Sequence, residues 1–229
     1  MQHIRVMLFI GAPGVGKGTY STHLTRYHNY FTISASDSLR EQPLAPEFAA
    51  MMKQGRVLPG SVVHECVKNS IVVKSRMHPD KKLIVDGFPR NLEQALLLDK
   101  DRSEIEVRQV IHFTLPDSVI ERKLLARRIC SNRQVCKSSY NLCDIHEDGI
   151  VMPAILPTKR LGFCDDCGSP LVPRDDDNIT VIRSRLKQFH RDTGLVVEFY
   201  REKGLLAEID GTGSLADRMQ ALLNTIKTP

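Results

Sequence analysis

A glycine-rich segment near the start of the chain carries residue types that bind phosphate. It reads Gly-Ala-Pro-Gly-Val-Gly-Lys-Gly-Thr over residues 11–19 and lies between a predicted strand and a predicted helix, the context that a phosphate-binding loop requires. Glycines allow successive backbone N–H groups to face a phosphate, a helix N-terminus adds positive potential, and Lys17 can reach terminal phosphates. An ordinary glycine-rich turn is the alternative. The predicted phosphate contacts are Gly14, Gly16, Lys17, Gly18 and Thr19.

A carboxylate and two arginines offer chemistry that complements such a loop. Asp86 ends a short apolar run, so we expect it beside the glycine-rich loop, where it could hold magnesium through ordered water. Arg40 and Arg90 could clamp a second phosphate, because a guanidinium matches phosphate oxygens in a bidentate fork. Simpler alternatives exist, since a strand-end carboxylate often caps the next turn and arginines are usually surface residues.

Five of the six cysteines crowd into one segment of the chain. They are Cys130, Cys136, Cys143, Cys164 and Cys167, whereas Cys66 lies alone in an apolar-periodic stretch. We interpret the apolar run at residues 6–10 as a strand leading into the glycine-rich loop and not as a secretion signal. Without such a signal, clustered cysteines favour metal binding over a disulfide scaffold.

The segments that must position these side chains alternate between strand-like and helix-like patterns. Short apolar runs rich in β-branched residues predict strands at 6–10, 31–33, 83–85, 110–113 and 205–209. Helical patterns cover 18–27, 61–77, 117–128, 180–203 and 215–226, with Asp117 as a cap and Gly204 closing the fourth. This alternation predicts an α/β fold in which a five-stranded parallel sheet has helices on both faces.

Two stretches interrupt the alternation and are predicted insertions. Residues 34–60 hold several prolines, and residues 129–173 hold the clustered cysteines. The predicted core therefore comprises residues 1–33, 61–128 and 174–229, and a chain of 229 residues is expected to form one compact domain bearing these lobes.

Composition excludes several classes of protein. With 41% apolar and 26% charged residues and no low-complexity tract, the chain is typical of a globular enzyme or binding protein and not of a disordered one. No apolar stretch approaches the roughly 18 to 20 residues that span a bilayer, so we expect no membrane partner. The net charge of +5 suits an anionic ligand, but 32 basic against 27 acidic residues is too balanced to indicate nucleic acid. We expect a cytoplasmic monomer.

Motifs along almost the whole chain resemble those of the adenylate kinase family of nucleoside monophosphate kinases. The Gly-Lys-Gly-Thr at the end of the glycine-rich loop is one. The others, in order, are Ile-Ser-Ala-Ser-Asp-Ser-Leu-Arg at 33–40, Asp-Gly-Phe-Pro-Arg at 86–90, Arg-Arg at 127–128, Asp-Asp-Asn at 176–178 and Asp-Gly-Thr at 210–212. Several motifs in this order within one chain make coincidence a poor explanation of the resemblance.

The resemblance implies a P-loop NTPase fold and Mg²⁺-dependent transfer of the terminal phosphoryl group of ATP or GTP to AMP. Residues 34–60 would then form the lobe that binds the acceptor, and residues 129–173 a lid that excludes water on closing. Beyond the loop, the implied donor contacts are Arg122 or Lys123 and Arg127. The implied catalytic residues are Lys17, Asp86, Arg90, Arg127, Arg174 and Arg185. The implied AMP contacts are Ala35, Arg40, Arg56, Val57, Gly87, Arg90 and Gln94. Many arginines without an obvious base suit phosphoryl transfer, which depends on positioning and electrostatics.

Two features bear on the acceptor in opposite directions. Ala35 stands where adenylate kinases usually have threonine and where UMP/CMP kinases often have alanine. Gln94 matches the glutamine with which the family reads adenine, and UMP/CMP kinases usually have asparagine there and a short lid. Taken alone, a glutamine in a helix more often lies on a solvated face. We expect AMP, with a UMP/CMP kinase as the alternative.

The cysteine segment resembles the zinc-type lids of this family, which carry two Cys-x-x-Cys pairs. Cys164 and Cys167 match the second pair, whereas the first is widened to Cys130 and Cys136. We expect one structural Zn²⁺ bound by Cys130, Cys136, Cys164 and Cys167. Cys143 or His146 could replace Cys136 as a ligand, and a lid of free thiols without metal is the remaining alternative.

Two other classes of function deserve comparison with a phosphotransferase. A catalytically silent regulatory module is expected to have lost some of the site, yet Lys17, Asp86, Arg90, Arg127 and Arg185 are all present. A nucleic-acid-binding zinc module requires aromatic or basic stripes, and the aromatic content is only 6% with no tryptophan. The enzyme is therefore the favoured prediction.

Overall fold

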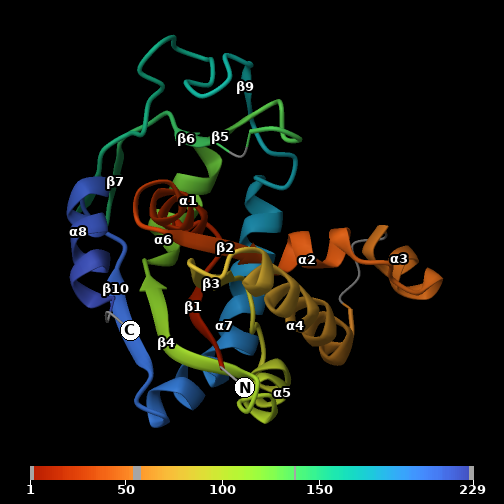
Figure 1. The fold of residues 1–229 in the computed structure, drawn as a ribbon. Helices are drawn as coiled ribbons and strands as arrows, with labels where there is room; N and C mark the ends of the chain where they lie inside the picture. The colour runs from red at the N-terminus through yellow and green to blue at the C-terminus, as the bar shows by residue number, and fades with distance from the viewer. Residues whose placement is uncertain (1–2, 54–57, 137, 227–229) are drawn as a thin grey trace.

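A parallel sheet forms the centre of the molecule in the computed structural model, which describes residues 3–53, 58–136 and 138–226 (Figure 1). Its five strands run in the order β10-β4-β1-β3-β2, and every pairing is parallel. The strands are β1 (Ile4–Gly11), β2 (Tyr30–Ser34), β3 (Lys82–Asp86), β4 (Ile105–Thr114) and β10 (Leu206–Asp210). The predicted α/β fold is therefore confirmed.

Strand β4 begins at Ile105, earlier than its apolar run predicts. The polar residues Arg108 and Gln109 break the apolar pattern in the sequence. Gln109 is nevertheless only 4% exposed, and its Nε2 donates to the carbonyl of Thr225 at 2.9 Å. A hydrogen bond to a carbonyl of a distant segment thus lets a polar residue occupy a buried position within the strand.

Helices cover both faces of the sheet, because alternate residues of β1 point to opposite sides. Val6, Leu8 and Ile10 pack with α4 (Gly60–Met77), α5 (Leu92–Lys100) and the C-terminal half of α7 (Ile179–Glu202). Met7 and Phe9 pack on the other side. Their neighbours there are α1 (Lys17–Tyr27), α6 (Asp117–Leu125), the N-terminal half of α7 and α8 (Leu215–Thr225). The glycine-rich loop thus leaves the sheet between two packed layers of helices.

The helix predicted over residues 117–128 is shorter than expected. It ends at Leu125, and Arg127 and Arg128 belong to β5 (Arg127–Cys130). Strand β5 pairs with β6 (Ser139–Asn141) and β9 (Leu171–Val172), so partners distant in the chain decide where the helix stops. Asp117 is not the expected cap, since Pro116 occupies that position and the Asp117 carboxylate lies 2.9 Å from Nε2 of His190.

The two interrupting stretches lie outside the central sheet. The first contains the short helices α2 (Ala35–Glu41) and α3 (Pro46–Lys53), which extend to one side in Figure 1. The second contains the sheet β6-β5-β9, above the central sheet in the same view, and a hairpin of β7 (Ile145–Glu147) and β8 (Ile150–Met152). The exact domain boundaries stay predictions. In the described part of the chain, no helix has the length and apolar character to cross a membrane.

Candidate active site

The glycine-rich loop joins the carboxyl end of β1 to the first turn of α1. Gly14 and Gly16 have φ angles of 93° and 110°, a region that favours glycine. A Cβ at Gly14 would lie 2.8 Å from Cγ of Leu124 on α6, so the loop approaches that helix too closely for a side chain. Thr19 donates its backbone N–H to the carbonyl of Gly16 at 2.9 Å, which starts the helix. The loop therefore has the backbone shape that phosphate binding requires.

The Lys17 ammonium folds back over this loop. Its Nζ donates to the carbonyls of Gly11 at 2.6 Å and Ala12 at 3.1 Å. Burial lowers the pKa of Lys17 to about 8; attraction to Asp86 opposes this, and repulsion from Arg90 and from Arg185 adds to it. A desolvated ammonium held in this way gains charge stabilisation when a phosphate approaches it.

Asp86 lies at the carboxyl end of β3, next to the glycine-rich loop. Strand β3 pairs with β1 so that Asp86 aligns with Phe9, just before the loop begins. Burial raises the pKa of Asp86, and the nearby charges of Lys17 and Arg90 oppose that rise. A carboxylate oxygen at this place suits a hard cation such as Mg²⁺, which takes oxygen ligands.

The loop between β3 and α5 holds two predicted acceptor residues in a fixed arrangement. Arg90 Nε donates to the carbonyl of Gly87 at 2.9 Å, and Gly87 has a φ of 77°. Gln94 Oε1 accepts the backbone N–H of Arg90 at 2.8 Å, and the Asn91 side chain caps α5 by accepting the N–H of Gln94. Gln94 is only 5% exposed, so it does not lie on a solvated face.

The other predicted acceptor residues lie on α2 or outside the described chain. Ala35 begins α2 and is buried. Arg40 is exposed, and its Nη1 donates to the carboxylate of Asp37 at 3.1 Å. Arg56 and Val57 fall outside the described residues. The structure therefore brings Gly87, Arg90 and Gln94 together, while Arg40 forms an ion pair on its own helix.

Two adjacent carboxylates hold the three arginines predicted to contact the transferred phosphoryl group. Asp177 accepts two hydrogen bonds from Arg127, at 2.7 and 2.6 Å, and its side chain is only 3% exposed. Asp176 accepts from Arg174 and from Arg185, each at 2.9 Å. Sequence reasoning assigned these aspartates no role beyond a family motif. Their signal was the placement of two consecutive acidic residues among arginines expected to meet.

Of the two predicted donor-side cations on α6, Lys123 faces the glycine-rich loop and Arg122 does not. Lys123 Nζ donates to the carbonyl of Val15 at 3.2 Å. Burial, aided by repulsion from neighbouring cations, lowers the pKa of Lys123 to about 7. Arg122 is mostly exposed, and its Nε lies 2.9 Å from the carboxylate of Glu147 on the β7–β8 hairpin.

Arg218 of α8 is a buried cation that sequence reasoning missed. It is 4% exposed, and it donates from Nη1 to the hydroxyl of Tyr20 at 3.2 Å and from Nε to the carbonyl of Ser214 at 3.1 Å. It contributes to the repulsion that lowers the pKa of Lys123. An arginine in an amphipathic helix is normally a surface residue, so the pattern offered no signal for its burial.

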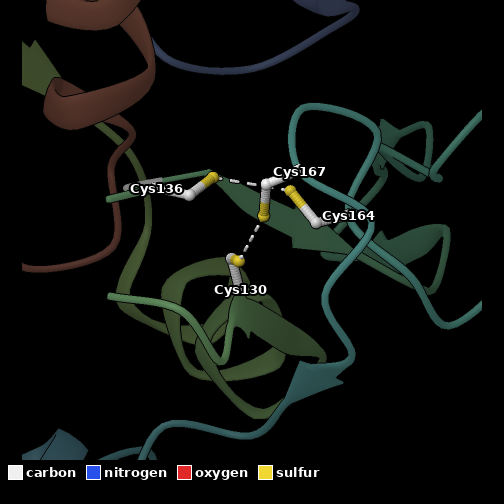
Figure 2. Close-up of side chains that lie close together, drawn as sticks. All are labelled: Cys130, Cys136, Cys164 and Cys167. Atoms are coloured by element: carbon white, nitrogen blue, oxygen red, sulfur yellow. Dashed lines mark hydrogen bonds between the residues drawn. The ribbon is translucent and has the colours of Figure 1, made fainter. Parts of the chain in front are cut away.

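Four cysteine sulfurs converge in the segment between β5 and β9, as Figure 2 shows. Cys130 and Cys167 sulfurs lie 3.3 Å apart, those of Cys136 and Cys164 lie 3.5 Å apart, and all four lie within 4.8 Å of one another. A tetrahedral zinc site with Zn–S bonds of about 2.3 Å has sulfur–sulfur edges of roughly 3.8 Å, so the cluster has the size to hold zinc. Cys143 is exposed and is not part of the cluster.

The surroundings of the cluster favour the thiolate form of Cys164 and disfavour that of Cys130. Burial raises the pKa of Cys130 to about 12. Burial also acts to raise the pKa of Cys164, but backbone N–H groups of Cys167 and Asp166 outweigh it and lower that pKa to about 6. A bound cation would stabilise all four thiolates, because a coordinating thiol is deprotonated.

Comparisons with known proteins identify the family of the chain. The family model described as "Adenylate kinase" matches residues 9–205 of the chain. An adenylate kinase of Thermodesulfovibrio yellowstonii is 35% identical over 216 residues, which covers 91% of this chain and 93% of that protein. An adenylate kinase of Thermotoga petrophila is 33% identical over 215 residues, 90% of each, and one of Caldicellulosiruptor saccharolyticus is 31% identical over 229 residues, 96% of this chain and 98% of that protein. The chain therefore belongs to the adenylate kinase family.

Proposed function

We propose that this protein transfers the terminal phosphoryl group of ATP or GTP to AMP in a Mg²⁺-dependent reaction. The observation that carries the proposal is that charged residues of the glycine-rich loop and of the loop after β3 interact with one another. The charge of Lys17 in the glycine-rich loop interacts with those of Asp86 at the end of β3, Arg90 in the loop that follows, and Arg185 of α7. Residues far apart in the chain thus lie close enough for their charges to interact where a donor and an acceptor phosphate would meet.

On the donor side, the residues assigned to ATP or GTP are Gly14, Gly16, Lys17, Gly18 and Thr19, with Lys123 and Arg127. Backbone N–H groups of the loop bind the phosphate oxygens, and Lys17 follows the charge that develops on the transferred group. Asp86 would hold Mg²⁺ through ordered water, and the bound cation would neutralise phosphate charge. Arg122 is the weaker candidate, because it is paired with Glu147.

The carboxylates of Asp176 and Asp177 give the arginines a partner before nucleotide binds. Arg127 would otherwise be a partly buried guanidinium without a counter-charge, which is costly. A donor phosphate offers the same bidentate geometry and competes for these arginines. Arg127, Arg174 and Arg185 then stabilise the charge of the transition state, as the positioning chemistry of phosphoryl transfer requires.

On the acceptor side, Arg90 clamps the AMP phosphate and Gln94 reads the base. Gln94 uses Oε1 to hold Arg90, which leaves its amide N–H₂ to donate to the ring nitrogen of adenine. Gly87 and Ala35 line the same side. Arg40 joins them by exchanging Asp37 for phosphate, and Arg56 and Val57 stay predictions from the resemblance.

The lid binds one structural Zn²⁺ through Cys130, Cys136, Cys164 and Cys167. This segment has few apolar side chains to stabilise its fold, and bound zinc would supply that stabilisation. Reduced thiols are needed for this site, and a cytoplasmic location keeps them reduced. The protein is a monomer and binds no nucleic acid. Light scattering after size exclusion measures its oligomeric state.

An assay that crosses ATP, GTP, CTP and UTP with AMP, UMP, CMP and GMP tests the proposal. We expect ATP or GTP with AMP to have the highest kcat/KM. A higher value for UMP or CMP would make Ala35 the decisive residue and identify a UMP/CMP kinase. Nucleotide binding without transfer in any combination would identify the silent regulatory module instead.

A further inference from the structure

A buried histidine joins the acceptor loop to the two helices around it. His64 of α4 is 6% exposed, and its Nε2 lies 2.8 Å from Oδ2 of Asp101, the residue that ends α5. In the described chain neither atom forms an aligned hydrogen bond, with the other or with any other group, so their close contact is an electrostatic one. Lys68, one turn along α4, donates to Oδ1 of Asp101 at 2.7 Å. Both oxygens of this carboxylate thus face α4.

The same imidazole touches the loop that carries the acceptor residues. Its ring lies edge-on to Phe88, with the ring centroids 6.1 Å apart and the planes at 62°. Phe88 is 1% exposed and sits between Gly87 and the Arg90 that binds Gln94. His64 therefore contacts the middle of the loop on one side and the end of α5 on the other.

Helix α5 transmits the position of Asp101 to the residues at its other end. It begins directly after the loop, where Asn91 caps it through the N–H of Gln94. A helix of nine residues is a short rigid rod, so a shift at Asp101 moves Gln94 and, through its Oε1, the backbone of Arg90. On the opposite side, Thr193 Oγ1 of α7 donates to the carbonyl of Arg90 at 3.0 Å.

Core packing alone does not account for a polar pair in this place. An apolar residue at position 64 would fill the space beside Phe88 and avoid the cost of burying a carboxylate and an imidazole, which often offsets what such a pair contributes to stability. A buried polar pair does define one relative orientation of the elements that it joins. Burial lowers the pKa of His64, and the attraction of Asp101 opposes this, so the contact does not rely on a fully charged imidazole.

We propose that His64 is a positioning residue of the acceptor site. Together with Asp101 it holds α4, the helix that follows the acceptor lobe, at a fixed angle to the loop of residues 86–90. It thereby keeps Arg90 and Gln94 in the arrangement that receives the acceptor nucleotide, and in this sense the inference rests on the proposed function. Loss of the contact costs acceptor binding and spares the donor contacts of the glycine-rich loop.

Kinetics of His64→Leu test this role. We expect KM for AMP to rise about tenfold, ~1.4 kcal/mol of binding free energy, while KM for ATP stays within about twofold of the parent. His64→Gln, whose amide can donate to Asp101, should recover most of the loss. The matched control is His112→Leu, because His112 pairs with Glu208 at 3.1 Å between β4 and β10, away from the acceptor loop. It should leave KM for AMP unchanged.

Hydrogen exchange of the nucleotide-free protein gives a second readout that needs no activity. His64→Leu should speed exchange in residues 86–94 and leave the glycine-rich loop unchanged. Asp101→Asn must act in the same direction, and it serves as the second variant should His64→Leu fail to fold. A parent-like KM for AMP with parent-like exchange overturns the proposal, and so does an equal rise of both KM values with faster exchange throughout. If the parent transfers no phosphoryl group, the proposed function fails, and the exchange arm still decides whether His64 positions the loop.

Discussion

Replacing Lys17 with methionine is expected to stabilise the nucleotide-free protein while removing most of its activity. Lys17 is partly buried in the glycine-rich loop, and desolvation lowers its pKa from 10.5 to about 8. At neutral pH the folded protein therefore carries the cost of a desolvated ammonium group. Methionine has a similar length and no charge, so the substitution removes that cost without opening a large cavity.

The size of the stabilisation follows from the pKa and from two hydrogen bonds. A pKa difference of about 2.5 corresponds to ~3.4 kcal/mol in favour of the substitution. The ammonium also donates to the carbonyls of Gly11 and Ala12, and each of these bonds contributes ~1 kcal/mol that methionine loses. The free energy of unfolding should therefore rise by ~1–2 kcal/mol at pH 7, which is about 3–6 °C in Tm for a chain of this size.

The stabilisation should depend on pH in a definite direction. The folded pKa of Lys17 lies below the unfolded one, so between about pH 8 and 10.5 the unfolded chain binds more protons and the parent gains stability as pH rises. The advantage of Lys17→Met is thus fully present below about pH 8 and shrinks above it. Toward pH 10.5 it reverses, because the neutral amine keeps its hydrogen bonds. Urea unfolding at pH 7, 8, 9 and 10 measures this course.

Activity should change in the opposite sense to stability. Removing one preorganised charge-stabilising donor costs ~2.7–4 kcal/mol of transition-state stabilisation, so kcat should fall about 100- to 1,000-fold with little change in acceptor binding. The control is Lys100→Met, an exposed lysine on α5, which should alter neither activity nor the pH course. A kcat within threefold of the parent, or a lower Tm for Lys17→Met at pH 7, would refute the reasoning.

Three further predictions concern the donor site and the lid. First, kcat/KM for the donor should fall as pH rises through about 8, since unprotonated Lys17 offers no charge to the triphosphate; a flat profile from pH 7 to 9.5 contradicts this. Second, Asp177→Asn should lower the free energy of unfolding by ~3 kcal/mol, because it leaves Arg127 without its buried counter-charge; calorimetry that finds no loss counts against the pair. Third, elemental analysis should find about one zinc per chain, and Cys164→Ser should abolish it, whereas Cys143→Ser should not. Metal-free protein with unchanged stability and activity after chelation would make the cysteines simple thiols.

Local patterns in the sequence were sufficient for the main sheet and the glycine-rich loop. Apolar runs predicted all five strands, because a short continuous or alternating apolar pattern is typical of a strand buried in a sheet. The loop was predictable since its conformation depends on glycines and a lysine within a few positions of one another. The predicted helix end at residue 128 was wrong: the helix ends at Leu125, because pairing of β5 with β6 and β9 overrides a helical pattern.

Only the tertiary structure decided which residues far apart in the chain become neighbours. The sequence left open whether Cys136, Cys143 or His146 completes the sulfur cluster, and the fold brings Cys136 to it. It likewise could not tell whether Lys123 or Arg122 faces the loop. Which side chain lies beside another depends on the path of the whole backbone between them. The entropic cost of closing a loop changes only slowly with its length, so the spacing of two residues in the sequence does not predict whether they meet.

The buried charges show the same limit most clearly. Arg218 and His64 lie in helical patterns that predict ordinary positions, yet both are buried against polar partners from other elements. Burial of a polar group is tolerated only where a partner of the right kind is present, and that partner comes from another part of the chain. The sequence therefore determined which residues could do phosphate chemistry, and the packing of distant segments determined which charges face each other.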